Sequence, residues 1–213
     1  MLQILQKEIE GTVLTFTNQR ALYWEEEGVL VLSDLHVGKA AHFRKHGLAV
    51  SSDILHTDLK KLAQLIDHFQ PKQVIIVGDL FHAGYNSDLN LFKEWRLSFS
   101  QDSVLISGNH DRLSKAQYLD LGIHNVNGQI VIGPFTFVHH PTIIGANHFY
   151  ISGHIHPGFV LEGKHERLRL PCFAVSDQQI VLPAFSMFTG LDTKTLKGDF
   201  KHLVFTEDAI FEM

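Results

Sequence analysis

Five short apolar segments of this chain are each followed by residue types that bind metal ions. Segments of this kind, rich in β-branched residues and bounded by Gly or Asp, are typical of strands. Functional groups converge at the loops that follow the strands of a packed sheet. We therefore expect the candidate ligands to meet at one edge, in numbers sufficient for two metal ions. The segments and the residues that follow them are 29–32 with Asp34 and His36, 74–77 with Asp79, 104–106 with Asn109, His110 and Asp111, 135–138 with His139 and His140, and 149–152 with His154 and His156.

Two of these motifs place a pair of ligand types two residues apart. Asp34 and His36 can reach one ion only if the backbone turns directly after the strand. His154 and His156 have the same spacing, and the preceding Gly153 can adopt backbone conformations closed to other residues. One such pair occurs by chance, and a single histidine is more often a packed or surface residue. Five placements together favour a metal site.

The donor types indicate the ions and the reaction. Carboxylate, imidazole and amide donors suit Mn, Fe and Zn, and the lack of thiolates argues against a closed structural zinc site. In a two-metal site with ions roughly 3.5–4 Å apart, a carboxylate bridges the ions, which also lower the pKa of a bridging solvent to generate hydroxide. Asp79 is the candidate bridge. The residues alone thus predict metal-assisted hydrolysis of a phosphate ester, whose oxygens the ions neutralise.

The composition of the chain limits the classes of nucleic acid that it can bind and the cellular compartment in which it is expected. The chain has 213 residues, 15 histidines and a formal net charge of -5, which fits a short or single-stranded nucleic acid better than a long duplex. Lys39, Arg44 and Lys45 form either a local basic patch or a solvated loop. The single cysteine, Cys172, suits a reducing cytoplasm, and no apolar run approaches the roughly 20 residues that cross a bilayer. We predict a cytoplasmic protein without a membrane segment.

The order of expected elements indicates an α/β fold. A hairpin over 11–24 precedes a strand, helix, strand unit from 29 to 77, whose helix begins near Ser51 or Ser52. Further helices are expected over about 88–99 and 114–122. After Gly128 the pattern changes to strands, with late hairpins turning at 176–178 and 206–208. A two-sheet β-sandwich flanked by helices, formed as a single domain over 1–213, accommodates both halves.

The motifs, in this order, resemble those of the calcineurin-like binuclear metallophosphoesterases. The resemblance implies a four-layer αββα fold, with His110 as general acid and Asp111 either orienting the site or capping its loop. Both His139 and His140 follow the fourth strand, and we take His139 as the ligand because it comes directly after Val138. The implied ligands are Asp34, His36, Asp79 and His156 for one metal, and Asp79, Asn109, His139 and His154 for the other.

A narrower resemblance, covering most of the chain, is to the bacterial DNA-ligase-associated metallophosphoesterases. It implies a manganese-dependent phosphodiesterase or DNA endonuclease in a repair pathway shared with a DNA ligase, an exonuclease and a helicase. Two residues depart from the pattern: His140 stands where an acidic residue is expected, and Ser186 where glycine is expected. The segments that carry the resemblance are 33–40, 78–82, 108–112, 153–157, 170–173 and 182–190.

Several alternatives remain open at this point. The metal motifs do not set the leaving group, so a phosphomonoesterase or a nucleotide or lipid pyrophosphatase is the nearest rival. A non-catalytic scaffold, like the retromer subunit of this fold, is disfavoured because every ligand type is present. Arg112 follows the third motif and could pair with a substrate phosphate or form a surface ion pair.

Overall fold

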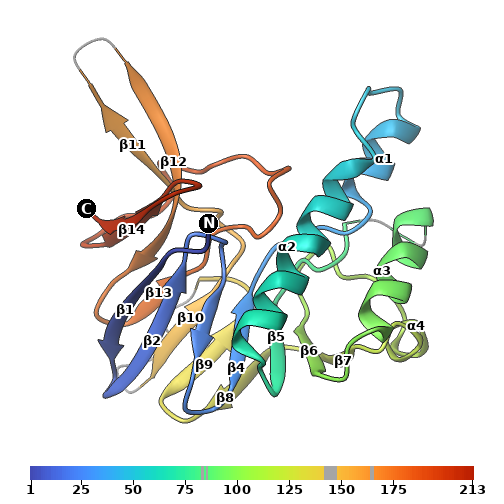
Figure 1. Ribbon diagram of the computed structural model, residues 1–213, viewed down its shortest axis with the longest axis horizontal. Helices are drawn as coiled ribbons and strands as arrows, with labels where there is room; N and C mark the ends of the chain where they lie inside the picture. Colours follow the sequence, from blue (N-terminus) through green and yellow to red (C-terminus); the bar gives the residue numbers. More distant parts are fainter. Residues whose placement is uncertain (83, 85, 142–147, 164–165) are drawn as a thin grey trace.

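Two β-sheets with helices over one of them make up the computed structural model, which describes residues 1–82, 84, 86–141, 148–163 and 166–213 (Figure 1). The first sheet has the strand order β1-β2-β3-β4-β5-β6-β7, and the second has the order β15-β14-β12-β13-β10-β9-β8, with β11 paired to β12. The strands of the first sheet are β1 (Ile4–Ile9), β2 (Thr12–Thr17), β3 (Leu22–Trp24), β4 (Val29–Leu32), β5 (Gln73–Val77), β6 (Asp102–Ile106) and β7 (His124–Val126). The remaining strands are β8 (Gln129–Ile132), β9 (Phe135–Val138), β10 (Phe149–Ser152), β11 (Gly158–Glu162), β12 (Arg167–Val175), β13 (Gln179–Val181), β14 (Lys201–Phe205) and β15 (Ile210–Glu212).

The first sheet changes from antiparallel to parallel at β4. Strands β1 to β4 form a meander, whereas β4, β5, β6 and β7 run parallel and are joined by helical crossovers. In the parallel part, Val31 lies opposite Ile75, which lies opposite Val104. Parallel neighbours end at the same edge of a sheet, so the loops after β4, β5 and β6 come together there.

The parallel strands are buried on both faces. In β4, Val29 and Val31 pack between the two sheets, whereas Leu30 and Leu32 pack against the helical layer. This explains why β4 is continuously apolar rather than alternating. Between the sheets, the Phe16 ring meets the Phe173 ring edge to face with centroids 5.1 Å apart. The two sheets therefore share one apolar interior.

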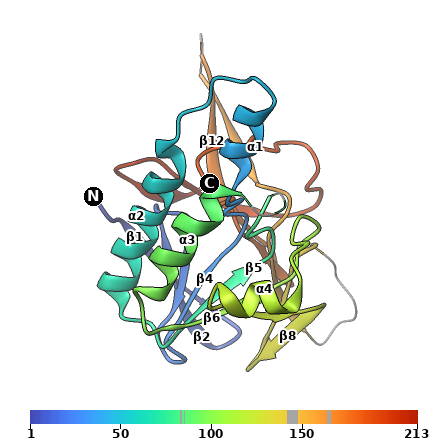
Figure 2. The same ribbon diagram turned by 90° about the vertical axis from the view of Figure 1, so that its right-hand side faces the viewer.

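The helices cover the outer face of the first sheet. They are α1 (Lys39–Lys45), α2 (Asp53–Phe69), α3 (Ser87–Leu97) and α4 (Lys115–Asp120). Leu59, Phe92 and Tyr118, from α2, α3 and α4, pack in the same cluster as Leu30 and Leu32 of the sheet. Figure 2 shows α2 and α3 side by side over the first sheet. Among the described residues, no helix covers the outer face of the second sheet, and none has the length and apolarity needed to cross a bilayer.

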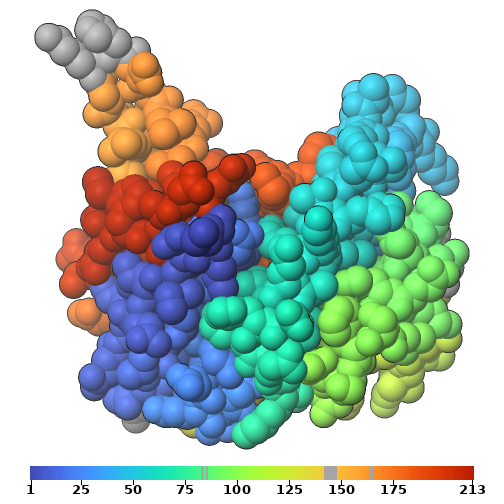
Figure 3. Space-filling view, viewed as in Figure 1, coloured from blue at the N-terminus to red at the C-terminus, as the bar shows by residue number. Residues whose placement is uncertain are grey.

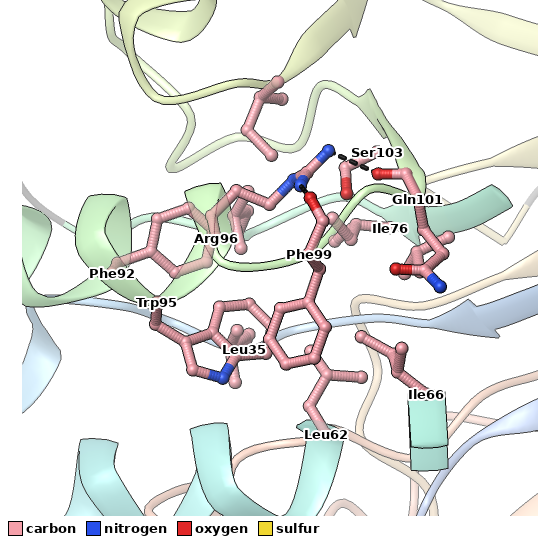
Figure 4. A pocket seen from close by; sticks show the side chains of 13 residues that line it. Leu35, Leu62, Ile66, Ile76, Phe92, Trp95, Arg96, Phe99, Gln101 and Ser103 are labelled. Atoms are coloured by element: carbon pink, nitrogen blue, oxygen red, sulfur yellow. Dashed lines mark hydrogen bonds between the residues drawn. The ribbon is translucent and has the colours of Figure 1, made fainter. Parts of the chain in front are cut away.

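The space beneath α3 is filled by side chains rather than by a ligand site. Figure 4 shows Phe92, Trp95 and Phe99 converging there, with the Arg96 guanidinium bonded to the backbone carbonyls of Phe99 and Gln101. The cavity measures only about 10 Å³, which is about the volume that one water molecule needs. This pocket is part of the core.

Strands β11 and β12 form an arm that projects from the second sheet. They pair from Gly158 opposite Pro171 to Glu162 opposite Arg167 (Figure 1). At the base of β12, Cys172 is fully buried, and burial raises the pKa of its thiol to about 12. The cysteine is thus a packing residue.

The expected elements are largely confirmed. All five ligand-bearing strands, the α2 crossover and both late hairpins form, and the fold class is the expected two-sheet α/β arrangement. Among the described residues the helices lie over the first sheet alone, so the fourth layer of the implied αββα fold is not seen. Three short elements, β1, α1 and β7, were not anticipated. The 39–45 stretch, read as a basic patch or a solvated loop, is a helix that begins after Gly38 at φ 88°. Its seven residues are too few to show a clear periodicity.

Removing a ring from the shared interior should destabilise the whole fold. Phe173→Ala should lower the free energy of unfolding by about 3–5 kcal/mol, because it deletes a fully buried aromatic side chain and leaves a cavity. Urea denaturation followed by circular dichroism would measure the change. Val131→Ala, at a side chain that is 53% exposed, serves as the control and should change stability by less than about 0.5 kcal/mol. Equal effects of the two substitutions would contradict this account of the core.

Candidate metal centre

The loops after β4, β5 and β6 meet those after β9 and β10 at the boundary between the sheets. Backbone hydrogen bonds lock them together: Asp34 N–H donates to Gly78 O at 3.0 Å, and His36 N–H donates to Asp79 O at 3.0 Å. From the second sheet, Gly153 N–H donates to His139 O at 3.1 Å. These bonds join the first motif to the second and the fourth to the fifth, and His154 N–H, which donates to Asp34 Oδ2 at 3.0 Å, joins the two pairs.

The backbone at most of the candidate ligands is in the left-handed region. Five residues there, all candidate ligands, have φ between 51° and 69°, and the part of the chain that is described has only three other non-glycine residues with positive φ. Such conformations cost free energy and persist where the surrounding structure imposes them. They provide the sharp turn that the two-residue spacings require. The five residues are Asp34, His36, Asp79, His154 and His156.

The first ligand group joins Asp34, His36 and His156. Their ligand atoms lie within 4.8 Å of one another, and Asp34 Oδ1 is 3.1 Å from His156 Nε2. Asp34 Oδ1, His36 Nε2 and His156 Nε2 are all buried without a hydrogen-bond partner. Leaving buried polar atoms unsatisfied is costly, and a cation coordinated by all three removes that cost. This group fits a metal ion.

The second group joins Asp79, Asn109, His139 and His154. His139 Nε2 lies 3.2 Å from Asn109 Oδ1, 3.2 Å from His154 Nδ1 and 3.5 Å from Asp79 Oδ2. His139 Nδ1 faces Val77 O at 3.0 Å, a bond it makes as donor, and this leaves the Nε2 lone pair directed at the other three groups. All three other donors thus lie within 3.5 Å of His139 Nε2, and His140 also offers a ligand atom within 4.8 Å of those of His139 and His154, so this region also fits a metal ion. Asp34, Asp79 and His139 offer ligand atoms within 4.8 Å of one another, so the two groups adjoin.

The electrostatic environment keeps His36 and Asp79 in their metal-binding forms. Burial lowers the pKa of His36 to about 3, so its imidazole is neutral at physiological pH. Burial opposes ionisation of Asp79, but hydrogen bonds from His139 and the His110 N–H outweigh it and lower the Asp79 pKa to about 2. His139 differs: burial disfavours its charged form, yet its bonds to Asp79 and Val77 raise its pKa. A metal ion bound at His139 Nε2 takes the place of the proton that this raised pKa favours.

Glycines allow the ligand loops to approach closely. A Cβ at Gly78 would lie 2.0 Å from His139 Nδ1, and one at Gly108 would lie 2.2 Å from Asp79 Oδ1. At Gly153 it would lie 2.6 Å from the Cβ of Ser33, beside Asp34. The motif glycines are needed because any side chain would displace a ligand.

The remaining predicted site residues surround the ligands in different ways. His110 lies at the ligand groups, with its N–H donating to Asp79 Oδ1 at 2.9 Å and its ring centroid 5.6 Å from that of His36. Asp111 instead accepts hydrogen bonds from Phe81 N–H and Gly108 N–H, both at 2.9 Å. Burial raises its pKa to about 6. Asp111 therefore shapes the loop rather than facing the ligands, while exposed Arg112 bonds to Asn109 O at 3.3 Å.

Other histidines lie beside the centre. The His82 ring stacks on the His110 ring, with centroids 4.7 Å apart and planes at 22°. Phe81, next to it in the chain, is fully buried in the core. His140 is exposed, with its ring centroid 4.2 Å from that of His154. Residue spacing in the sequence does not predict these contacts, because they join loops that follow different strands.

No protein-family model and no curated protein matches the sequence. Among solved structures, the nuclease MPE of Pseudomonas putida is similar over 99% of this chain and 100% of its own, with 31% sequence identity and a TM-score of 0.85. Yfce, a phosphoesterase from E. coli, shares 14% identity over 82% of this chain and 87% of its own, with a TM-score of 0.45, which adds nothing to the assignment.

The two-sheet fold, the converging carboxylates and imidazoles and the full-length likeness together define a metal-dependent phosphoesterase. More specifically, the chain belongs to the calcineurin-like metallophosphoesterases.

A side chain at Gly78 should damage the metal centre without unfolding the protein. Gly78→Ala should weaken Mn²⁺ binding by about 10- to 100-fold, because the added methyl group displaces the His139 ring. Gly47→Ala is the matched control, since Gly47 has nearly the same φ, +83° against +82°, but open space around it. Isothermal titration calorimetry measures binding, and circular dichroism checks folding. Equal metal affinity in the two variants would refute this role for Gly78.

Proposed function

We propose that this protein is a manganese-dependent phosphodiesterase that cleaves DNA as an endonuclease. The observation that carries the proposal is the adjacency of two ligand groups through Asp34, Asp79 and His139, with His110 beside them. Two-metal sites of this kind act on phosphate esters, because paired cations neutralise the charge of the reacting phosphoryl group.

We infer a specific division of the ligands between two divalent ions. The distances within each ligand group support the assignment, and the buried unpartnered atoms support the first ion most directly. Nitrogen and oxygen donors without thiolate favour manganese, with iron or zinc as alternatives. One ion takes Asp34, His36, Asp79 and His156, and the other takes Asp79, Asn109, His139 and His154, with Asp79 shared.

Each remaining residue has a separate task in the proposed mechanism. When bound, the ions supply Lewis acidity toward the phosphate oxygens and acidify a water molecule. His110 donates a proton to the leaving oxygen, and its backbone bond to Asp79 Oδ1 fixes the loop that carries it. Asp111 is a positioning residue, because its carboxylate holds Phe81 and Gly108. Arg112, exposed at the rim, is placed to meet a flanking substrate phosphate.

The proposed substrate rests on the full-length likeness to a nuclease and on charge. The structural relative is called a nuclease, and the net charge of -5 favours short or single-stranded DNA over a long duplex. The resemblance of segments such as 33–40 and 182–190 to the ligase-associated subgroup supports a cytoplasmic repair pathway. We propose a DNA ligase, an exonuclease and a helicase as pathway partners on that resemblance alone.

A comparison of two small substrates tests the reaction class. The manganese-loaded protein should hydrolyse bis-p-nitrophenyl phosphate with a kcat/KM at least about tenfold above that for p-nitrophenyl phosphate, because a diesterase site is matched to a phosphate that carries two ester groups and one negative charge. Release of p-nitrophenol measures both rates, and cleavage of a single-stranded oligonucleotide follows. Preference for the monoester would replace the proposal with a phosphomonoesterase. Inactivity on both, with metals bound, would favour a narrow pyrophosphatase or a scaffold.

His110→Ala tests the assigned acid. The variant should keep two metal ions per chain and lose roughly 10²- to 10⁴-fold in kcat on DNA, because general acid catalysis contributes about that much. Metal content by elemental analysis and cleavage rates on gels are the measurements. His124→Ala, at an exposed histidine on β7, is the control and should retain full activity. Full DNA cleavage by metal-loaded His110→Ala would show that the acid is another group.

A further inference from the structure

Aromatic rings continue outward from His110 to the surface near α1. His82 stacks on His110, and the Phe43 ring lies 6.4 Å from the His82 ring at an angle of 26°. Beyond it, Phe43 meets Phe188 edge to face, with centroids 5.6 Å apart. Phe43 and Phe188 are only half-buried, so each keeps accessible ring surface. The metal centre thus has an aromatic path leading away from it.

A hollow opens beside Phe188. Its volume is about 330 Å³, at the lower end of the roughly 300–1,000 Å³ range of small-molecule pockets. Ile54, Met187 and Phe188 supply apolar walls, and most of the exposed lining is apolar. The polar groups at its edge include Asp53 and Ser51. A flat ring with polar edges matches this lining, because the ring can stack on Phe188 and form hydrogen bonds with the polar groups of the hollow.

A cation connects the hollow to the metal centre. Lys39 Nζ lies 5.8 Å from the Phe188 ring centroid, and its charge interacts with the carboxylates of Asp34 and Asp79. Among the described residues, the hollow is lined by acidic Asp53 and by Asp58, which is paired with Lys61, and by no basic residue. A substrate phosphate is therefore favoured near Lys39, whereas the hollow favours an uncharged ring that offers a hydrogen-bond donor, as the ring N–H or the exocyclic amine of a base does.

The wall of the hollow is anchored to a ligand loop. Phe185 N–H donates to Ser33 O at 2.8 Å, and Ser186 N–H donates to Asp34 O at 3.3 Å. The buried Lys61 ammonium donates to Phe185 O at 2.8 Å, and Met187 N–H donates to Asp58 Oδ1 at 3.4 Å. Phe188 is thus held at a fixed place relative to Asp34. Figure 3 shows the surface hollowed between the β11–β12 arm and α1.

We propose that Phe188, Ile54 and Met187 form a subsite for one unpaired nucleobase of the substrate, with Lys39 contacting the phosphate between that base and the metal centre. The inference rests on the proposed action on DNA and adds where a base binds. A base must leave its pair and its stack to enter the hollow, so the subsite selects single-stranded or unpaired nucleotides. Stacking of a base on an aromatic side chain is sequence-tolerant.

A double-mutant-type cycle, in which the wild type and Phe188→Ala are each assayed on two substrates, tests the subsite. The substrates are single-stranded tetrathymidylate and the same tetramer without bases, each followed as loss of intact oligomer by manganese-loaded protein. Removing the bases should lower kcat/KM by about 5- to 150-fold for the wild type, in the range of base–aromatic stacking. Phe188→Ala should lower kcat/KM on tetrathymidylate by a similar factor. Removing the bases should then cause little further loss in Phe188→Ala, because the base and the ring act through the same contact. Phe188→Trp should restore the effect of the base.

Two further variants complete the test. Ile54→Trp fills the hollow and should reduce the benefit of the base without removing Phe188. Phe69→Ala removes a half-buried ring stacked on Tyr23 at the far end of α2, and should behave as wild type on both tetramers. The subsite alone would be overturned if removing the bases lowered kcat/KM by the same factor in Phe188→Ala as in the wild type. It would also be overturned if Phe188→Ala had no effect on a tetramer that the wild type cleaves. Wild-type turnover of bis-p-nitrophenyl phosphate without any cleavage of oligonucleotides would overturn the action on DNA and the subsite with it.

Discussion

Two carboxylates buried side by side constrain the rest of this structure. Asp34 is fully buried and Asp79 nearly so, at 0% and 2% exposure, and each offers an oxygen within 4.8 Å of His139. Burying like charges together is costly unless positive charge accompanies them. The two carboxylates raise the pKa of His139, and divalent ions bound by the same groups supply the positive charge. The strained turns and motif glycines follow from the same requirement, since they bring the two carboxylates together.

A second buried charge cluster supports the first from outside. Lys61 lies under the Phe185 ring, with Nζ 4.1 Å from its centroid, and Arg20 donates to Ala184 O at 2.9 Å. Buried Asp58 balances Lys61 at 3.5 Å, although burial still lowers the Lys61 pKa to about 8. These charges hold the 184–187 backbone, which in turn bonds to the Asp34 loop. The departure from glycine at Ser186 is accommodated here, because its hydroxyl accepts a bond from Phe188 N–H at 3.2 Å.

The elements that carry the ligands were predictable, because long apolar runs with a ligand at the end of each encode both a strand and a site. The pattern of strand ends gives ten candidate residues, from which the resemblance to the metallophosphoesterases selects seven ligands, and the folded chain brings these seven together. The β1 strand was missed because it alternates exposed and half-buried residues, which reads as mixed composition. The orientation of Asp111, the stacking of His82 on His110 and the hollow at Phe188 depend on contacts between distant loops. No local pattern encodes such contacts.

The burial of Cys172 makes the chain convenient for site-directed labelling. At pH 7 to 8 the native protein offers no thiolate, because Cys172 is fully buried and its thiol pKa is near 12. A cysteine placed at an exposed position of the β11–β12 arm, such as Arg167, is then the single reactive thiol of the folded protein. A nitroxide or fluorophore attached there reports the distance between the arm and the metal centre without any background from the native sequence.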